Sequence, residues 1–218
     1  MPSNRTKHTL YRIQRPPTEF VVDAQIDQAV GICIRAYDGD TALKAMLGDD
    51  LKLTDIFFRS MLRGGALEGS FYIANDGKNT SVVSSVSVCF PPGVSWVYLV
   101  GEAKSSGNWD FMSSGMDSLL KRNIGGRAHK GKRRLGTEWV VSLIATDPAE
   151  QHKGHATSIM NEICDQAARE HRMVGLSTQT LDNAAWYESL GFTKLGERQV
   201  AAPTNDFPSI LLVKEPSS

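Results

Sequence analysis

One stretch of the sequence limits the fold more than any other: an apolar run, a short turn around a glycine, and a periodic helix. The run Trp139–Ala145 has the length and the two-sided apolar character of a central sheet strand. After the turn around Gly154, apolar residues recur at helical offsets, which indicates a helix that packs one face on a core. A buried strand followed closely by such a helix predicts a sheet covered by helices. The apolar positions of the helix are Ala156, Ile159, Met160, Ile163, Cys164, Ala167 and Ala168.

The turn between this strand and helix has the composition of an anion-binding site. The first amides of a helix have no partner within the helix, and the helix dipole favours a negative group there. Gly154 and the small Ala156 would let a phosphate approach the backbone of residues 152–157. The turn lacks the Gly-Lys-Ser/Thr of a P-loop and the three glycines of a dinucleotide fingerprint. It fits a Gln-x-x-Gly-x-Ala pattern that begins at Gln151.

The rest of the sequence predicts alternating strands and helices, which together indicate one mixed α/β domain over residues 1–218. A helical insert is expected at about 91–136, with Asn108 as the cap of its helix. Before the insert, the expected elements are a strand at Leu10–Gln14, a helix from Val22 to Tyr37, a short helical turn capped by Thr41, a helix from Leu53 that ends at Gly64-Gly65, a strand at Ser70–Ala74, a hairpin turn at Asn75–Asn79 and a strand at Val82–Phe90. After the central helix they are a strand at Val174–Thr180, a helix capped by Asp182, and strands at Phe192–Val200 and Ser209–Val213.

Composition excludes some classes of partner. The 24 Lys and Arg residues balance 24 Asp and Glu residues, which argues against bulk attraction to nucleic acid or an anionic membrane. Lys121–Arg134 is rich in basic residues and is either a solvated loop or a nucleic-acid patch, but it lacks the aromatic residues that stack on bases. No apolar run approaches the ~20 residues of a membrane helix. We therefore expect neither a nucleic-acid nor a membrane partner, and the sequence leaves the oligomeric state open.

The N-terminus and the cysteines indicate a cytoplasmic protein. No apolar core follows the basic residues of the N-terminus, so no secretory signal is expected. The three cysteines, Cys33, Cys89 and Cys164, are odd in number, widely spaced and set in apolar patterns. This arrangement favours reduced, buried thiols and fits no zinc-site spacing.

Two blocks of the sequence resemble the GNAT family of acetyl-CoA-dependent N-acetyltransferases. The first is Leu143–Pro148 together with Gln151–Ala156, and the second is Asn183–Phe192. The resemblance covers about residues 137–196. It departs from the family at Ala156, where glycine is most frequent, and at Thr146, where an aliphatic residue is usual. It implies one acyltransferase domain with a central, mostly antiparallel mixed sheet flanked by helices.

The resemblance also implies roles for individual residues toward acetyl-CoA. Around Ala145, the amides of Ile144 and Thr146 would hold the pantetheine and polarise the thioester carbonyl. Asn183 would hydrogen-bond the coenzyme, and Tyr187 would sit near its sulfur and protonate the leaving thiolate. Lys153 would add a cation beside the pyrophosphate. The coenzyme-binding residues expected in the turn are Gln151, His152, Lys153, Gly154, His155, Ala156 and Thr157.

The general base and the acceptor pocket stay open at this level. A base must take a proton from the attacking amine, and Glu138, Ser142 or a water chain are the alternatives. Asp38 and Asp40 either line the amine pocket or serve as capping and surface residues. Two aromatic residues of the insert, Trp96 and Tyr98, either line the pocket or pack.

A metal site is not expected. His152 and His155 form a His-x-x-His pattern, but the sequence offers no third ligand, and we expect both side chains to be solvated.

The sequence thus predicts an enzyme, an N-acetyltransferase that moves the acetyl group of acetyl-CoA directly to a primary amine without a covalent enzyme intermediate. The neutral charge and the aromatic residues of the insert favour a small-molecule amine. The alternatives are a protein or peptide N-acetyltransferase and a non-catalytic acyl-CoA-binding sensor domain.

Overall fold

The structure is a computed structural model that describes residues 9–13, 19–67, 71–75, 82–92, 94, 138–202 and 204–216. Several predictions lie outside these residues: most of the hairpin turn at Asn75–Asn79, Trp96 and Tyr98, the helix from Asn108, the basic segment Lys121–Arg134, and nearly all of the insert at 91–136.

The described strands form a mixed, mostly antiparallel sheet flanked by helices, as predicted. Their hydrogen-bonded order is β1-β2-β3-β4-β5-β7-β6. The β1–β2, β2–β3, β5–β7 and β6–β7 pairs are antiparallel, and the β4–β5 pair is parallel. The strands are β1 (Thr9–Ile13), β2 (Phe71–Asn75), β3 (Ser85–Phe90), β4 (Trp139–Thr146), β5 (Val174–Thr178), β6 (Thr193–Val200) and β7 (Phe207–Lys214).

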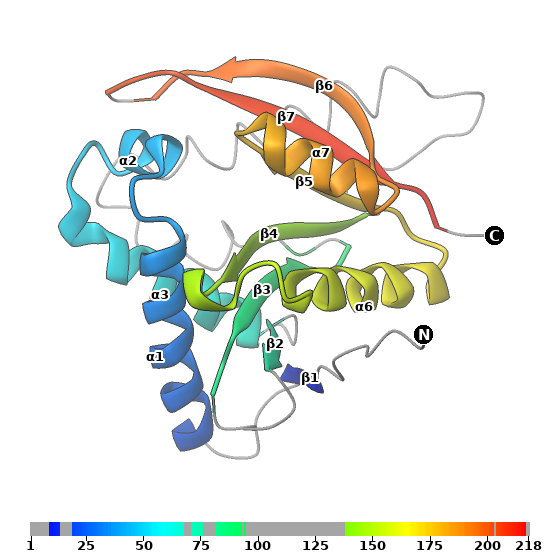
Figure 1. The fold of residues 1–218 in the computed structure, drawn as a ribbon, viewed down its shortest axis with the longest axis horizontal. Coiled ribbons are helices and arrows are strands. Elements are labelled where there is room, and N and C mark those ends of the chain that lie inside the picture. Colours follow the sequence, from blue (N-terminus) through cyan, green and yellow to red (C-terminus); the bar gives the residue numbers. More distant parts are fainter. Residues whose placement is uncertain are drawn as a thin grey trace. The chain divides into compact units, whose positions relative to one another are not determined.

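Along the described part of the chain, five α-helices separate these strands in sequence. They are α1 (Glu19–Ala36), α2 (Thr41–Met46), α3 (Thr54–Leu67), α6 (His155–Arg169) and α7 (Leu181–Ser189) (Figure 1). None of the helices in this part of the chain is both long enough and apolar enough to cross a membrane.

The chain is divided between two compact units whose segments alternate along the sequence. The first unit comprises Met1–Asp38, Asp55–Cys89 and Leu143–Ile163, and the second comprises Gly39–Thr54, Phe90–Ser142 and Cys164–Ser218. Strand β4 and helix α6 each contribute one part to either unit. A single domain over 1–218 stays a prediction.

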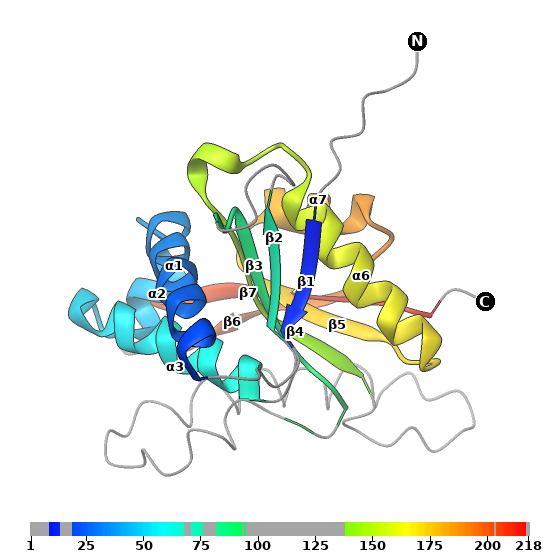
Figure 2. The ribbon, with the colours of Figure 1, turned by 90° about the horizontal axis from the view of Figure 1, so that it is seen from below.

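The first unit is built on the β1–β2–β3 ladder (Figure 2). Within it, Ile73 lies opposite Val86. Both faces of β2 and β3 are buried, so apolar residues on either side contribute to the core. Helices α1 and α3 are joined by an ion pair between Asp27 and Arg59.

Helix α3 continues through Gly64-Gly65 to Leu67, although the sequence predicted that it ends there. Gly65 is explained by a close approach between this helix and the sheet. A Cβ atom at Gly65 would lie 2.7 Å from Cγ1 of Val88 in β3, well inside van der Waals contact. Here glycine makes room for a neighbouring strand and does not end the helix.

The second unit contains β5, β7 and β6 with helices α2 and α7. Ala42 and Ala45 of α2 pack on Phe207 at the start of β7. The ammonium of Lys214 donates to the carbonyl oxygen of Leu190 at 2.7 Å. A cation at this place satisfies a carbonyl at the C-terminal end of α7 and complements the helix dipole.

Two helix caps differ from those predicted. Helix α2 is capped by Asp40, whose side chain accepts a hydrogen bond from the Leu43 amide, and not by Thr41. Helix α7 is capped by Thr180, whose hydroxyl accepts from the Asn183 amide, whereas Asp182 lies inside the first turn. In both cases the capping residue has an extended backbone, which a residue inside the helix cannot adopt.

Candidate functional site

Strand β4 carries three of the predicted coenzyme-binding residues. Its buried side chains alternate with half-buried ones, so one face is less sealed than the two-sided apolar sequence predicted. The ladder with β5 covers residues 139–141 of β4, which lie opposite 174–176. Ile144, Ala145 and Thr146 lie beyond this ladder, toward the turn that precedes α6.

Two serines of β3 bind carbonyl groups of β4. The Ser87 hydroxyl donates to the Leu143 carbonyl at 2.7 Å, and the Ser85 hydroxyl donates to the Ala145 carbonyl at 2.9 Å. Backbone groups of successive residues in an extended strand point to opposite edges. The carbonyl and amide of Ile144, between these two residues, therefore point away from β3.

The last turn of α1 and the residue that follows the helix contact the same end of β4. The Tyr37 hydroxyl donates to the Ile144 carbonyl at 3.1 Å. One residue past β4, the Asp147 carboxylate accepts from Nε of Arg35 at 3.1 Å and from its Nη2 atom. Sequence reasoning missed both contacts, because they join residues 107 and 112 positions apart and no local pattern records such pairs.

The turn between β4 and α6 is held by short hydrogen bonds and two residues with left-handed backbone. Asp147 caps a 3-10 turn, Pro148–Glu150, by accepting from the Ala149 amide at 3.0 Å. His152 and Gly154 then have φ angles of 61° and 89°. Such angles are uncommon for a non-glycine residue and readily adopted by glycine, so Gly154 suits the reversal of the chain before α6.

Glu150 connects this turn to the start of α6. Its carboxylate accepts from Nζ of Lys153 at 2.9 Å and lies 3.4 Å from Nε2 of His155. The hydrogen bond from Lys153 is the largest influence on the pKa of Glu150, which falls below its usual value, and His155 adds to the effect. His155 is 1% exposed, so the prediction that both histidines are solvated is wrong for His155, while His152 is exposed.

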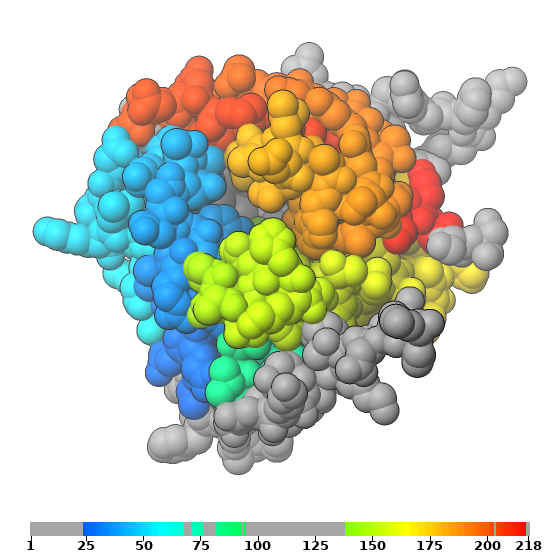
Figure 3. All heavy atoms as spheres, in the orientation of Figure 1, coloured from blue at the N-terminus to red at the C-terminus, as the bar shows by residue number. Residues whose placement is uncertain are grey.

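The start of α6 is accessible. The amide of Ser158 donates to the carbonyl of Gly154 at 2.9 Å, so the amides of residues 155–157 precede the intrahelical ladder. Ala156 and Thr157 are half-buried. The turn and the beginning of the helix lie on the face shown in Figure 3, coloured yellow-green. The exposed turn residues are Gln151, His152, Lys153 and Gly154.

The two remaining predicted site residues belong to α7 in the second unit. Asn183 is exposed in the first turn, where its amide donates to the Thr180 hydroxyl at 3.2 Å. Tyr187 is 6% exposed, with its ring centroid 4.6 Å from that of Trp186 and 5.7 Å from that of Phe192. Burial raises the pKa of Tyr187 above its usual value, so the phenol is protonated at neutral pH.

The residues considered for the general base and the acceptor pocket have distinct surroundings. Glu138 is 5% exposed just before β4, and Ser142 within β4 is half-buried. Asp38 is exposed, and Asp40 is engaged as the α2 cap. The structure therefore gives Asp40 the capping role, one of the two roles considered for it.

The cysteines are free thiols. Cys33 and Cys89 are buried, as predicted, whereas Cys164 is half-buried. Burial raises the pKa of Cys33 to about 12, so this thiol is neutral and unreactive at physiological pH.

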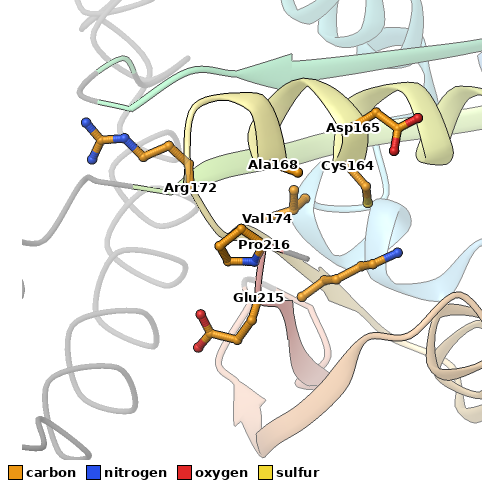
Figure 4. A pocket seen from close by; sticks show the side chains of 8 residues that line it. Cys164, Asp165, Ala168, Arg172, Val174, Glu215 and Pro216 are labelled. Carbon is orange, nitrogen blue, oxygen red and sulfur yellow. The ribbon is translucent and has the colours of Figure 1, made fainter. Parts of the chain in front are cut away.

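A small pocket lies in the second unit, where side chains of α6 meet the end of β7 (Figure 4). None of the predicted site residues lines it. Within the described ranges, no group of three or more His, Cys, Asp or Glu residues is placed to hold a metal ion. The pocket is lined by Cys164, Asp165, Ala168, Arg172, Val174, Lys214, Glu215 and Pro216.

Comparison with known proteins finds a family model that matches part of the chain. Residues 121–194 match the family model described as an acetyltransferase (GNAT) domain, a range that contains both motif blocks. None of the curated proteins matches the chain in sequence.

Solved structures with the same fold include three acetyltransferases. The polyamine N-acetyltransferase of Drosophila melanogaster has a TM-score of 0.67 at 11% identity, over 96% of this chain and 100% of that one. The arylalkylamine N-acetyltransferase 2 of Aedes aegypti has a TM-score of 0.63 at 11% identity, over 97% and 100%. The ribosomal-protein-S18-alanine N-acetyltransferase of Escherichia coli has a TM-score of 0.55 at 14% identity, over 97% and 96%. At these identities the similarity is one of fold.

Proposed function

We propose that the chain is an acetyltransferase of the GNAT family, whose domain model matches residues 121–194, and that it transfers an acetyl group directly from acetyl-CoA to a primary amine of a small molecule. The observation that carries this proposal is the exposed turn at Gln151–Gly154, followed at once by the start of α6.

This turn has the properties that a coenzyme pyrophosphate requires. Gly154 adopts a left-handed backbone directly before the helix, and the next positions include the small Ala156. The amides of residues 155–157 precede the helix ladder and are oriented by the helix. Phosphate groups bind helix starts of this kind through backbone amides and the helix dipole. Lys153 would add a positive charge, although its ammonium is paired with Glu150 here.

Strand β4 would hold the other end of the coenzyme. Acetyl-CoA supplies an acetyl group activated as a thioester. The amides of Ile144 and Thr146 would hold the pantetheine and polarise the thioester carbonyl, where negative charge develops during attack by the amine. In the overall reaction the amine nitrogen bonds to the acetyl carbon, the carbon–sulfur bond breaks, the amine loses a proton and the sulfur gains one.

Tyr187 would supply the proton to sulfur, and Asn183 would contact the coenzyme. Burial keeps the Tyr187 phenol protonated, as a proton donor must be before the reaction. The general base that receives the amine proton would be Glu138, Ser142 or water. The site thus needs no metal ion and no covalent intermediate on the protein.

A small amine is favoured over a protein substrate by two observations. The chain has no net charge to attract a basic protein tail. Two of the similar structures are described as enzymes for polyamines and arylalkylamines, and both have higher TM-scores than the one described as acting on a ribosomal protein.

The proposal is tested by binding first and turnover second. Acetyl-CoA should raise the melting temperature, because a ligand that binds only the folded state stabilises it. Thiol release from acetyl-CoA should then appear with polyamines, arylalkylamines or amino acids. The rate of thiol release without added amine measures the background hydrolysis of acetyl-CoA.

Each of the other possible results favours a different function or contradicts the proposal. If neither acetyl-CoA nor CoA binds in calorimetry, the proposal is wrong. Binding without thiol release across the amines and peptides would favour a non-catalytic acyl-CoA sensor. Release with peptides alone would favour a protein or peptide N-acetyltransferase.

A further inference from the structure

Tyr37, which directly follows α1, contacts the predicted acetyl-binding strand. Its hydroxyl donates to the carbonyl oxygen of Ile144 at 3.1 Å. The side chain is half-buried, and its ring packs on Phe58 of α3 with centroids 5.3 Å apart. A tilted aromatic contact of this kind fixes the ring and therefore the position of the hydroxyl.

The contacted carbonyl belongs to the edge of β4 that the proposed reaction uses. The neighbouring carbonyls of Leu143 and Ala145 accept from serines of β3, so the backbone groups of Ile144 point to the opposite edge. The ladder with β5 covers only residues 139–141. The Tyr37 hydroxyl therefore holds a backbone group of β4 beyond this ladder.

A second contact, from the last turn of α1, fixes the backbone directly after β4. Arg35 forms an ion pair with Asp147, which directly follows β4. Tyr37 thus holds β4 at Ile144, and Arg35 holds Asp147, the residue directly after β4. Both contacts lie within the first unit.

We propose that Tyr37 is a positioning residue for acetyl transfer. Its hydroxyl fixes the peptide plane between Ile144 and Ala145, and with it the amides of Ile144 and Thr146, which would polarise the thioester carbonyl. The inference rests on the proposed function. Rotation of this plane turns the backbone on either side, where the amides of Ile144 and Thr146 lie. Donors that are fixed in advance stabilise developing charge better than donors that must reorganise.

The hydroxyl should affect the acetyl group and not the rest of the coenzyme. The pyrophosphate would be held by the turn at Gln151–Gly154 and the start of α6, whereas the Tyr37 hydroxyl donates to Ile144 of β4. Loss of the hydroxyl should therefore lower kcat while the Kd for CoA stays the same. A small misplacement of reacting groups costs up to about 100-fold in rate, and we expect a fall of about 10-fold or more in kcat.

Tyr37→Phe is the test, because it removes the hydroxyl and keeps the ring on Phe58. Ser60→Ala is the matched control: the Ser60 hydroxyl also donates to backbone carbonyls in the first unit, but to those of its own helix. Wild type and both variants are compared for kcat, for the Kd of CoA by calorimetry, and for melting temperature. Tyr37→His, which offers an N–H donor, should recover part of the lost kcat.

The expected result is a lower kcat for Tyr37→Phe alone, with an unchanged Kd for CoA. An unchanged kcat would overturn the inference, and so would a fall in kcat matched by an equal rise in Kd and a lower melting temperature, since that pattern marks a purely structural role. If Tyr37→Phe is too unstable to assay, Tyr37→His decides: kcat near the wild-type value supports the inference, and a complete loss at normal CoA affinity opposes it. Failure of the proposed function is seen separately, because wild type itself would then not bind CoA or release thiol.

Discussion

Arg35 and Asp147 form an ion pair that joins the last turn of α1 to the residue after β4, with 3.1 Å between Nε and Oδ2. The same carboxylate accepts from the Ala149 amide and caps the 3-10 turn before the candidate phosphate site. The hydrogen bond from Arg35 is the largest influence on the Asp147 pKa, which lies below its usual value. One carboxylate thus links a helix end to the shape of the candidate binding turn.

Arg35→Gln should lower the melting temperature slightly at pH 7, because a partly exposed ion pair contributes about 1 kcal/mol or less. The Asp147 pKa is lower in the folded state, so the pair stabilises the protein above the unfolded value of about 3.9 and loses this effect as pH falls through the folded value. The difference between wild type and variant should therefore disappear in strong acid. Thermal melts from pH 7 to pH 2 measure it.

Asp147→Asn is the control for this pair, because it removes the charge and keeps an oxygen that can accept from the Ala149 amide. It should match Arg35→Gln, and the double variant should be no less stable than either alone. Additive losses would mean that the two side chains stabilise the protein independently.

Gly154→Ala should weaken coenzyme binding. The residue has φ of 89°, where a side chain is strained by about 1–2 kcal/mol, and the added methyl would stand where a pyrophosphate must approach the backbone. We expect the Kd for CoA, measured by calorimetry, to rise about 10-fold or more. Gly48→Ala is the control, since Gly48 also has a positive φ and open space around its Cα. Equal effects of both variants on Kd would contradict the assigned role of Gly154.

Tyr187→Phe should lower kcat by about 100-fold or more without changing the Kd for CoA, because general acid catalysis typically contributes that much. Burial raises the pKa of Tyr187 above its usual value of about 10. The phenol therefore keeps its proton as pH rises, and kcat should not fall between pH 7 and about pH 10. Thiol release measured across this range checks both points. A basic limb centred well below pH 10 in wild type that is absent from Tyr187→Phe would show that the pKa of this phenol is lowered, which contradicts the effect expected from burial.

Gly65→Ala should destabilise the protein, because the new methyl would lie 2.7 Å from Cγ1 of Val88. Overpacking costs about 1–3 kcal/mol, and the better helix propensity of alanine offsets about 1 kcal/mol of it. Combining it with Val88→Ala should restore part of the loss, so the two changes should not be additive. Urea unfolding of both single variants and the double variant measures the coupling. If the stability losses of the two single variants simply add in the double variant, the new methyl at position 65 does not clash with Val88.

Sequence reasoning succeeded where a local pattern determines the structure. Apolar residues at helical spacing identified α1, α3 and α6, and the block from Asn183 to Phe192 identified α7 and lies within the range that matches the family model. The glycine turn before α6 also lies where its composition indicated, with Gly154 in a left-handed conformation.

It failed where the outcome depends on a distant partner or on backbone conformation. Gly65 looked like the end of a helix because Val88, which explains it, lies in another element. His155 looked solvated because the sequence does not show that the Glu150 carboxylate turns back to it. Thr180 and Asp182 are both good capping residues, and only the extended backbone of Thr180 distinguishes them.

The alternation of the two compact units along the chain has a consequence for how the protein can be divided. Neither unit is encoded by one continuous length of sequence, so no single cleavage and no simple truncation can separate them. Strand β4 and helix α6 each pass from one unit into the other, so loss of one unit removes part of an element from its neighbour. Limited proteolysis should therefore yield nicked, associated fragments or complete degradation, and not one surviving half.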